Sequence, residues 1–395
     1  MNPFAWIDTS LAELKISDLL RELPAGLEAA GPLTTGPLSA GCVNFASNDY
    51  LGMAGDARLG SAAVAACQQQ GVGRAASPLI CGRSTLHEQL EARLAEFLNA
   101  EAALLFTSGY AANVGVVPAL VDRGDCVYGD SLNHASLIDG CRLSRAERHV
   151  YSHCDMSELE TLLAAGGGFR RRLIVSDTLF SMDGDLAPLI ELVRLARKYD
   201  AMLLIDEAHA LGVFGNRVGK GGGGGLWEHI ADEIPDAESA PVVRMGTLSK
   251  ALGSAGGLVC GSKSLVKWLA NRSRSFVFST AHPSANSAAA LAALDIIEAN
   301  PHCGALLLQK ASDLRERLTA QGWDVTPSAS QIIPIRIGSA KQALALAGRL
   351  REAGYWVPAI RPPSVPEGQS LLRLSLTTAH TEAMVDGLME ELGKA

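Results

Sequence analysis

From about residue 58 onward, segments with the hydrophobic period of a helix alternate with short apolar runs that end at turn residues. Helices are predicted at the periodic segments 58–70, 85–99, 134–144, 157–165 and 187–199. Thr85 with Glu88, and Ser157 with Glu160, are predicted to form capping boxes for two of them. Strands are predicted at the apolar runs 102–106, 172–176, 201–205, 242–246 and 257–260. Short strands separated by helices are typical of an α/β fold with a mainly parallel sheet covered on both faces.

The two ends of the chain have a different pattern. The first fifty residues hold an amphipathic segment (11–23) and a short strand (43–46), joined by a stretch rich in Gly and Pro. Near the C-terminus a long Ala/Leu-rich helix (284–299) leads to two strands, near 331–337 and 371–376. The predicted division is an N-terminal arm, a large domain and a smaller α+β domain, over residues 1–50, 51–285 and 286–395.

Composition excludes several classes of protein. The net charge of −8 offers no long-range attraction for nucleic acid or an anionic membrane. No apolar stretch is long enough to span a bilayer, and the N-terminus lacks the features of a signal peptide. The eight cysteines form no CxxC pair, which indicates reduced thiols and a cytoplasmic protein. His149, His153 and Cys154 are metal-ligand residue types, but no second cluster accompanies them, so no metal site is expected.

The candidate chemistry follows the predicted strands, because ligands of such sheets bind beyond the carboxyl ends of the strands. Lys250 comes shortly after the run 242–246 and is surrounded by small residues that would let a flat ligand approach closely. A partly desolvated lysine favours its neutral amine, which can form a covalent bond with a carbonyl group. Most lysines are surface charges, so Lys250 is a weak signal by itself.

Asp206 directly follows the apolar run 201–205. A carboxylate at the buried end of a strand is costly unless it meets a cation or several donors. It either caps the following segment or pairs with a pyridinium nitrogen, which would keep such a ring protonated and electron-withdrawing. His209 lies three residues later and could reach the same ligand, or it could have a structural role.

Two further segments fit an aromatic phosphate ligand. Ser108, Gly109 and Tyr110 open a predicted helix, where free N–H groups and hydroxyls form an anion site or an ordinary helix cap. His134 offers an imidazole that could stack on an aromatic ring. Each signal is weak alone, but a carboxylate, a lysine, a phosphate site and a stacking histidine all converge on one edge of the sheet. This convergence predicts a site for pyridoxal phosphate (PLP).

The same residues lie in longer stretches that resemble the α-oxoamine synthases, from residue 44 almost to the C-terminus. The stretches that carry the resemblance are NFASNDYLG, SGY, NHAS, FSMDGD, DEAH and GTLSK, at 44–52, 108–110, 133–136, 180–185, 206–209 and 246–250. This family consists of PLP-dependent transferases of fold type I, which condense an amino acid with an acyl thioester and release carbon dioxide. The resemblance implies that fold, with a large sheet domain and a smaller α+β domain.

The resemblance also implies roles for individual residues. Lys250 would carry the cofactor covalently, Asp206 would pair with its ring nitrogen, and His134 would stack on its ring and face the substrate. His209 would bond the phenolic oxygen, with Ser181 near it. Lys250, His134, Asp206 and His209 are therefore the predicted catalytic residues.

Family members are homodimers with active sites at the subunit interface. The residues implied to bind the phosphate group are Ser108, Gly109 and Thr247, with Tyr110 also in the cofactor site and Ser279 and Thr280 reaching the phosphate of the partner subunit. The residues implied to bind the substrate are Arg21, Asn48, His134, Arg361 and Ser364. Arg361 would bind the substrate carboxylate, and Arg21 would contact the acyl group.

The stretch WVPAIRPPSVP at 356–366 resembles the branch of the family that joins L-alanine to a pimeloyl thioester, of CoA or a carrier protein, in biotin biosynthesis. The segment 80–85 departs from the expected pattern on the substrate side, which leaves the amino acid preference open. The alternative on the same scaffold is a glycine C-acetyltransferase, followed by a 5-aminolevulinate synthase. A PLP lyase or aminotransferase without a thioester substrate, and a PLP-free binding protein, are the other possibilities.

Overall fold

The computed structural model describes residues 2–21, 33, 41–215, 222–393 and 395. Its contacts divide the chain into two compact units. The first unit consists of Met1–Asn48, Met182–Gly184 and Leu307–Ala395, and the second of Asp49–Ser181 and Asp185–Leu306. The domain boundaries predicted at 50/51 and 285/286 stay predictions.

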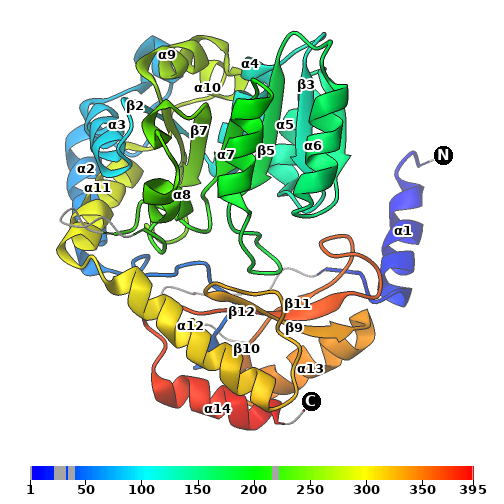
Figure 1. Cartoon of the computed structure of the whole chain (residues 1–395). Coiled ribbons are helices and arrows are strands. Elements are labelled where there is room, and N and C mark those ends of the chain that lie inside the picture. Colours follow the sequence, from blue (N-terminus) through cyan, green and yellow to red (C-terminus); the bar gives the residue numbers. More distant parts are fainter. Residues whose placement is uncertain (1, 22–32, 34–40, 216–221, 394) are drawn as a thin grey trace. The chain divides into compact units, whose positions relative to one another are not determined.

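The second unit contains a seven-stranded sheet with helices on both faces (Figure 1). Its strand order is β2-β8-β7-β6-β5-β3-β4. Only β8 runs antiparallel to its neighbours, so the prediction of a mainly parallel sheet is confirmed. The strands are β2 (Ala102–Phe106), β3 (Cys126–Asp130), β4 (Glu147–Tyr151), β5 (Arg172–Asp177), β6 (Met202–Asp206), β7 (Val242–Thr247) and β8 (Gly257–Gly261).

Two strands of this sheet, β3 and β4, were not predicted from the sequence. β4 lies at the edge of the sheet, so most of its side chains face solvent and no apolar run marks it. β3 ends in Gly129-Asp130, which shortens its apolar run. The five predicted strands all lie in this sheet, within one residue of the predicted bounds.

The helices of the second unit follow the predicted order. They are α2 (Ala57–Gln70), α3 (Thr85–Phe97), α4 (Gly109–Leu120), α5 (Ala135–Leu143), α6 (Met156–Ala165), α7 (Leu189–Lys198), α8 (Leu226–Ile230), α9 (Lys263–Arg272), α10 (Arg274–Val277) and α11 (Ser284–Ala299), with short turns η1 (Pro78–Gly82), η2 (Ala231–Glu233) and η3 (Ala237–Ser239). Val116 and Val117 of α4 belong to one buried cluster with Leu104 and Leu173 of the sheet. This packing buries α4 and fixes its N-terminus at the edge where β2 ends.

Both predicted capping boxes were placed wrongly. α3 is capped by Ser84 with His87, because Thr85 already lies inside the helix. α6 is capped by Asp155, whose carboxylate accepts from two backbone N–H groups, so Ser157 is the second helical residue.

The first unit contains the smaller sheet. β12 (Ser370–Ser375) lies between β9 (Ile332–Gly338) and β11 (Ala359–Ile360), antiparallel to both. The predicted strand at 43–46 is β1 (Val43–Asn44), which pairs with β10 (Tyr355–Trp356). The amphipathic segment predicted at 11–23 is α1 (Ala5–Ile16), which begins and ends earlier, and residues 22–23 lie outside the described residues. The other helices are α12 (Cys303–Ala320), which crosses the division between the units, α13 (Ala340–Glu352) and α14 (Glu382–Leu392).

Within the described part of the chain, no single helix is both long and apolar enough to cross a membrane. α11 and α12 meet the length and composition test only as a pair, and the pair is bent by 76° at its break. On α11, buried side chains such as Leu294 and Ile297 belong to the protein interior.

Candidate active site

The predicted strand-end residues lie along one edge of the large sheet. Asp206 is the last residue of β6 and pairs in register with Asp177, the last residue of β5. Lys250 lies three residues beyond the end of β7, and Ser108 lies two residues beyond the end of β2. Because β2, β5, β6 and β7 point the same way, all four residues are at the carboxyl edge.

Lys250 takes part in a chain of short contacts. Its Nζ atom lies 2.7 Å from Nε2 of His209, and Nδ1 of the same ring lies 2.6 Å from the hydroxyl of Tyr50. Tyr50 is fully buried. The phenol therefore fixes the orientation of the imidazole, with Nε2 directed at the lysine. Sequence reasoning assigned no role to Tyr50, because an aromatic residue in a turn-rich stretch has no pattern that separates packing from hydrogen bonding.

The carboxylate of Asp206 is held by two donors. Oδ1 accepts from the backbone N–H of Ala208 at 2.9 Å, and Oδ2 accepts from the side-chain amide of Asn113 at 2.8 Å. The same amide nitrogen lies 2.9 Å from Oγ of Ser136, which lies 2.7 Å from Nδ1 of His134. Asn113 therefore links two of the predicted catalytic residues. It was missed in the sequence, although a polar side chain on a largely apolar buried helix is a signal that could have found it.

The electrostatics of this edge favour a neutral histidine beside buried carboxylates. Burial lowers the pKa of His134, so its ring is neutral at pH 7. Burial, together with the neighbouring charge of Asp206, raises the pKa of Asp177 well above its usual range. Among the described residues, no Lys, Arg or His forms an ion pair with Asp206. A cationic N–H group in a ligand would supply the missing charge.

The predicted phosphate site is assembled at the start of α4. Ser108 is the N-cap of α4 and Gly109 is its first residue, so the free N–H groups of the first turn lie here. A Cβ atom added to Gly109 would lie 3.4 Å from Cβ of Thr247, which shows how closely this turn faces the end of β7. Tyr110 differs from these three residues, because its hydroxyl donates to Asp139 at 2.6 Å on the half-exposed surface of α5.

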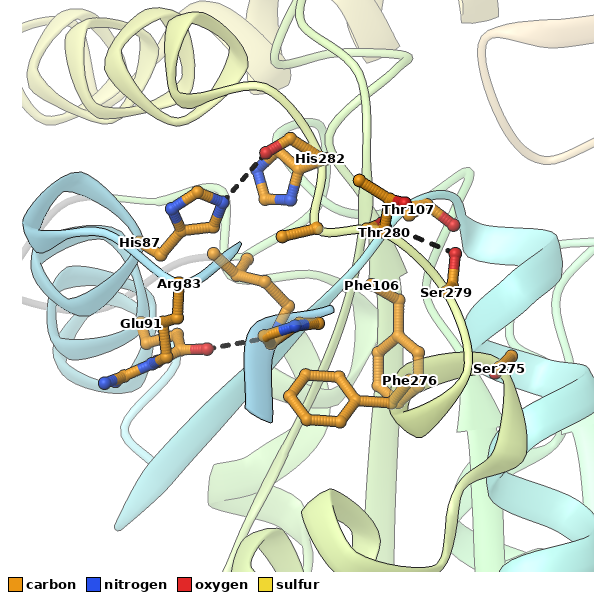
Figure 2. Close-up of a pocket in the computed structure, with 13 residues that line it drawn as sticks. Arg83, His87, Glu91, Phe106, Thr107, Ser275, Phe276, Ser279, Thr280 and His282 are labelled. Carbon is orange, nitrogen blue, oxygen red and sulfur yellow. Dashed lines mark hydrogen bonds and ion pairs between the residues drawn. The ribbon is translucent and has the colours of Figure 1, made fainter. Parts of the chain in front are cut away.

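Ser279 and Thr280 line a small cavity of about 10 Å³, enough for one water molecule (Figure 2). Thr107 lies at the same cavity, next to the phosphate site. On the other side, Nε2 of His87 lies 2.9 Å from the backbone oxygen of His282. Ser279 and Thr280 are thus near this chain's own Thr107, and their predicted contact with a partner's phosphate stays a prediction.

The first unit holds the predicted substrate residues. The guanidinium of Arg21 donates to Oγ of Ser364 at 3.3 Å, and Arg361 donates to the backbone oxygen of Asp18. Arg21, Arg361 and Ser364 therefore form one cluster. The positive charge of Arg21 contributes, after burial, to a lowered pKa of Arg361. Two adjacent guanidinium groups form a site for an anion such as a carboxylate.

Asn48 lies apart from that cluster. Its Oδ1 accepts from both terminal nitrogens of Arg373, each at 3.2 Å. Arg373 lies on β12 and is buried, so Asn48 is tied to the small sheet.

Comparison with known proteins identifies the family. Residues 40–392 match the family model described as aminotransferase class I and II. The 8-amino-7-oxononanoate synthase of Anaeromyxobacter dehalogenans (strain 2CP-1) is 46% identical over 387 residues, which cover 98% of this chain and 94% of the relative. That of Azoarcus sp. (strain BH72) is 46% identical over 350 residues, or 89% and 87% of the two chains. The chain belongs to the α-oxoamine synthase family.

Solved structures of α-oxoamine synthases have the same fold. Serine palmitoyltransferase of Sphingomonas wittichii aligns with a TM-score of 0.87 at 28% identity, covering 99% of this chain and 97% of the other. That of S. paucimobilis, with a bound PLP–myriocin aldimine, aligns with a TM-score of 0.88 at 27% identity over 98% and 96% of the chains. The cofactor of this α-oxoamine synthase is therefore PLP, and the predicted fold class is confirmed.

The residues at the sheet edge fit PLP. Asp206 is a buried carboxylate without a cationic partner among the described residues, which suits a protonated ring nitrogen. The neutral ring of His134 suits stacking, and the first turn of α4 suits the phosphate. The amine of Lys250 lies at the same edge, 2.7 Å from Nε2 of His209.

A pH prediction follows from His282, which lies at the cavity with Ser279 and Thr280. Burial lowers the pKa of His282 to about 3, against 6.5 for an ordinary histidine. Between those values the unfolded chain binds a proton that the folded chain excludes, so stability falls as pH decreases from 6.5 toward 3. His282→Gln removes this contribution. Urea unfolding at pH 7.5 and pH 4.5 should therefore show a larger loss of free energy of unfolding in the wild type than in the variant.

The exposed His302 provides the matched control. His302→Gln should lose stability in parallel with the wild type between the two pH values. Equal losses of the free energy of unfolding in the wild type and in His282→Gln would contradict the prediction.

Proposed function

We propose that this α-oxoamine synthase condenses L-alanine with a pimeloyl thioester, releasing carbon dioxide and the free thiol to form 8-amino-7-oxononanoate. Curated relatives with that name are 43% to 48% identical to nearly the whole chain. The observation that carries the proposal at the level of the site is the convergence of Lys250 and Asp206 at one carboxyl edge, with His209 2.7 Å from the lysine amine. The relatives do not favour the glycine C-acetyltransferase alternative.

Lys250 has two proposed tasks. Its amine would hold the cofactor covalently in the resting enzyme and would be released when alanine binds. The freed Nζ then removes the proton from Cα of alanine as a general base. His209 holds Nζ in place through its Nε2 atom, and Tyr50 holds the imidazole through Nδ1.

Asp206 has an electrostatic task. PLP supplies an electron sink for the electron pair left when a bond at Cα breaks. The carboxylate of Asp206 keeps a proton on the ring nitrogen, and this proton makes the ring electron-withdrawing. Asn113 and Ala208 hold the carboxylate in a fixed orientation, so little reorganisation accompanies the reaction.

The remaining roles follow the same geometry. We propose that Ser108, Gly109 and Thr247 bind the phosphate and that His134 stacks on the ring. Ser181 would bond the phenolic oxygen, and so would Nε2 of His209 once Nζ of Lys250 carries the cofactor and no longer occupies that nitrogen. In the first unit, the cluster of Arg21, Arg361 and Ser364 would bind the substrate carboxylate and the acyl group. Asn48 and Tyr110 are assigned to the substrate and cofactor sites by family resemblance alone.

The proposed assembly is a homodimer with shared active sites. Two large apolar side chains near Ser279 and Pro78 are strongly exposed: Ile80 and Phe278. Ile80 lies in η1 and Phe278 directly follows α10, and these two elements contact each other. An exposed apolar group of this kind is typical of a subunit interface. We also propose a cytoplasmic location, since none of the eight described cysteines forms a disulfide.

Release of free CoA tests the proposed reaction. Alanine with pimeloyl-CoA should give a kcat/KM at least about tenfold higher than glycine with acetyl-CoA, since each methylene group that fills an apolar pocket contributes on that scale. The assay measures thiol release with each pair in parallel, and 8-amino-7-oxononanoate is identified by mass spectrometry. Higher kcat/KM with glycine and acetyl-CoA would sink the proposal, as would amino acid turnover without any thioester.

A further inference from the structure

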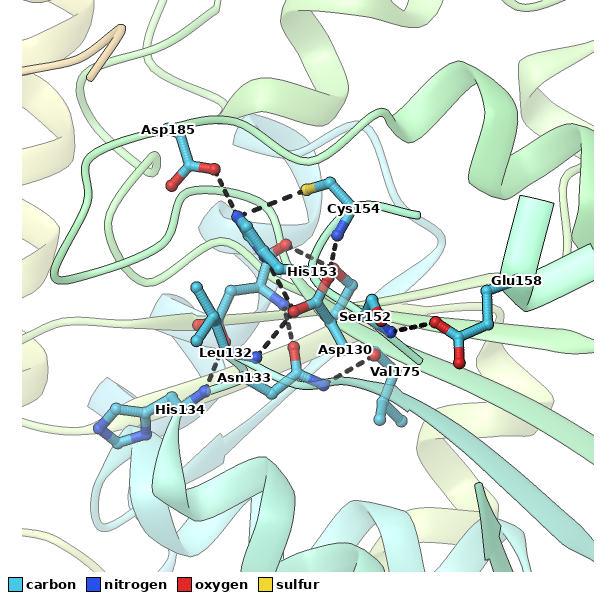
Figure 3. Close-up of polar contacts among 12 residues, drawn as sticks. Asp130, Leu132, Asn133, His134, Ser152, His153, Cys154, Glu158, Val175 and Asp185 are labelled. Carbon is cyan, nitrogen blue, oxygen red and sulfur yellow. Dashed lines mark hydrogen bonds and ion pairs between the residues drawn. The ribbon is translucent and has the colours of Figure 1, made fainter. Parts of the chain in front are cut away.

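A second buried charge cluster lies beside the cofactor residues, around His153 (Figure 3). Nδ1 of His153 lies 3.0 Å from Oδ1 of Asp130, and Nε2 lies 2.7 Å from Oδ2 of Asp185. Both carboxylates are buried, and the ring of Phe180 meets the imidazole edge-on at 4.4 Å. Because both ring nitrogens face carboxylate oxygens, the ring donates twice and is an imidazolium.

The imidazolium stays charged over the working range of an enzyme. Burial lowers the pKa of His153, but the hydrogen bonds that its ring donates to Asp130 and Asp185 outweigh burial and raise the pKa to about 12. Oδ1 of Asp185 is buried and has no partner among the described residues, so His153 provides the only bond to that carboxylate. Loss of His153 would leave Asp185 as an uncompensated buried charge.

On one side the cluster braces the segment that carries His134. Oδ1 of Asp130 accepts from the backbone N–H of Leu132 at 2.8 Å, and its backbone oxygen accepts from the N–H of Asn133. The side chain of Asn133 then bonds the neighbouring strand, at the backbone of Val175 and Asp177. The turn before His134 therefore depends on the orientation of Asp130.

On the other side the cluster braces the segment that carries Ser181. Phe180 and Asp185 flank this residue, and the N–H of Phe180 donates to the backbone oxygen of Asp185 at 3.0 Å. The ring of His153 packs edge-on against the ring of Phe180, and its Nε2 forms a charged hydrogen bond with Asp185.

We propose that His153 is a positioning residue that holds the segments of His134 and Ser181 in register for the cofactor. It touches neither cofactor nor substrate in this assignment and acts through Asp130 and Asp185. The inference rests on the proposed cofactor roles of His134 and Ser181, but not on which amino acid or thioester the enzyme uses.

A metal ion is the competing occupant of this cluster. One ligand atom each of Asp130, His153 and Cys154 lies within 4.8 Å of the others. A metal would have to displace a ring proton that two carboxylates hold, and the imidazolium already supplies the positive charge they require. We therefore favour the proton as the occupant.

The test is cofactor binding by His153→Gln. Apoprotein is titrated with PLP, and the dissociation constant is measured together with the visible circular dichroism of the bound cofactor. His153→Gln should raise the dissociation constant by about tenfold, the scale of one lost hydrogen bond to a charged group, and should change the dichroism. The matched control is His149→Gln, since the ring of His149 contacts Glu147 and stacks on Tyr128, neither of which belongs to the cluster. It should stay within about twofold of the wild type.

A double variant that keeps the buried charges matched distinguishes a positioning role of His153 from a general loss of stability. Asp185→Asn combined with His153→Gln removes one charge of each sign and leaves amide partners, while Asp130 keeps its backbone donors Leu132 and Cys154, so the double variant should recover most of the PLP affinity that His153→Gln loses. If His153→Gln does not fold, Asp185→Asn alone should raise the dissociation constant instead.

The inference would be overturned if folded His153→Gln had the PLP affinity and dichroism of the wild type. It would also be overturned if the double variant lost as much PLP affinity as the two single variants together. Saturable Zn²⁺ binding by the wild type that is lost in His153→Gln would favour the metal instead. Failure of the alanine and pimeloyl-CoA assay would leave these binding measurements intact, so the two proposals fail separately.

Discussion

Lys250→Ala should lower the rate of CoA release by about 10⁴-fold or more, because one side chain serves as both covalent anchor and base. The visible absorbance of the lysine-bound cofactor should disappear at the same time. Nζ of Lys250 lies 2.7 Å from Nε2 of His209, and the methyl group of alanine cannot form that contact. The measurement compares thiol release and the absorption spectrum of purified protein with PLP in excess.

Lys267→Ala is the matched control, since Lys267 is exposed on α9. Its turnover and spectrum should equal those of the wild type. A small primary amine added to Lys250→Ala should restore part of the proton transfer, because the lost group is a base. Normal turnover in Lys250→Ala would refute the assignment of this lysine.

Asp206→Asn should lower turnover by on the order of 10² to 10³-fold, the usual cost of removing one preorganised electrostatic group. An amide cannot hold a proton on the ring nitrogen, so the electron sink is weakened while the phosphate contacts remain. Exchange of the Cα proton of alanine with deuterium, followed by NMR without any thioester, isolates this step. The variant should bind PLP yet exchange slowly.

Asp177→Asn is the matched control for that variant. Asp177 lies beside Asp206 at the end of the next strand and is equally buried. Burial and the charge of Asp206 raise the pKa of Asp177, and its Oδ2 accepts the backbone N–H of His134 at 2.7 Å, a bond that the amide oxygen of Asn can also accept. Exchange should fall much less than in Asp206→Asn. Equal exchange rates in Asp206→Asn and the wild type would argue decisively against the ring-charge mechanism.

The local sequence pattern was sufficient to predict most strands of the large sheet. The runs that became β2, β5, β6, β7 and β8 are short and apolar because most are buried on both faces, and such runs can be recognised without a structure. β4 could not be recognised, because an exposed edge strand with Glu147, Arg148 and His149 resembles a loop in composition. The helix caps were misplaced by one or two residues, because Ser, Thr and Asp compete for that position and only the backbone selects one.

The residues of the candidate site also differ in whether the sequence alone revealed them. Asp206 and Lys250 were recognisable because each follows an apolar run with an unusual polar side chain. Asn113, Tyr50 and Asp177 were not assigned roles, because their partners come from other elements. His153 was considered only as a weak metal ligand, and the pairing with Asp130 and Asp185 that makes it an imidazolium is invisible in the sequence.

The sequence by itself determined the α/β class and the family, and it supplied the residues proposed to carry the chemistry, since these depend on local periodicity and on residue type. The tertiary structure decided how those residues are held. Tyr50 reaches His209 across 159 residues of chain, and Asn113 reaches Asp206 across 93. Hydrogen bonds over such separations exist only after the strands have paired and α4 has packed, and local pattern contains no record of them.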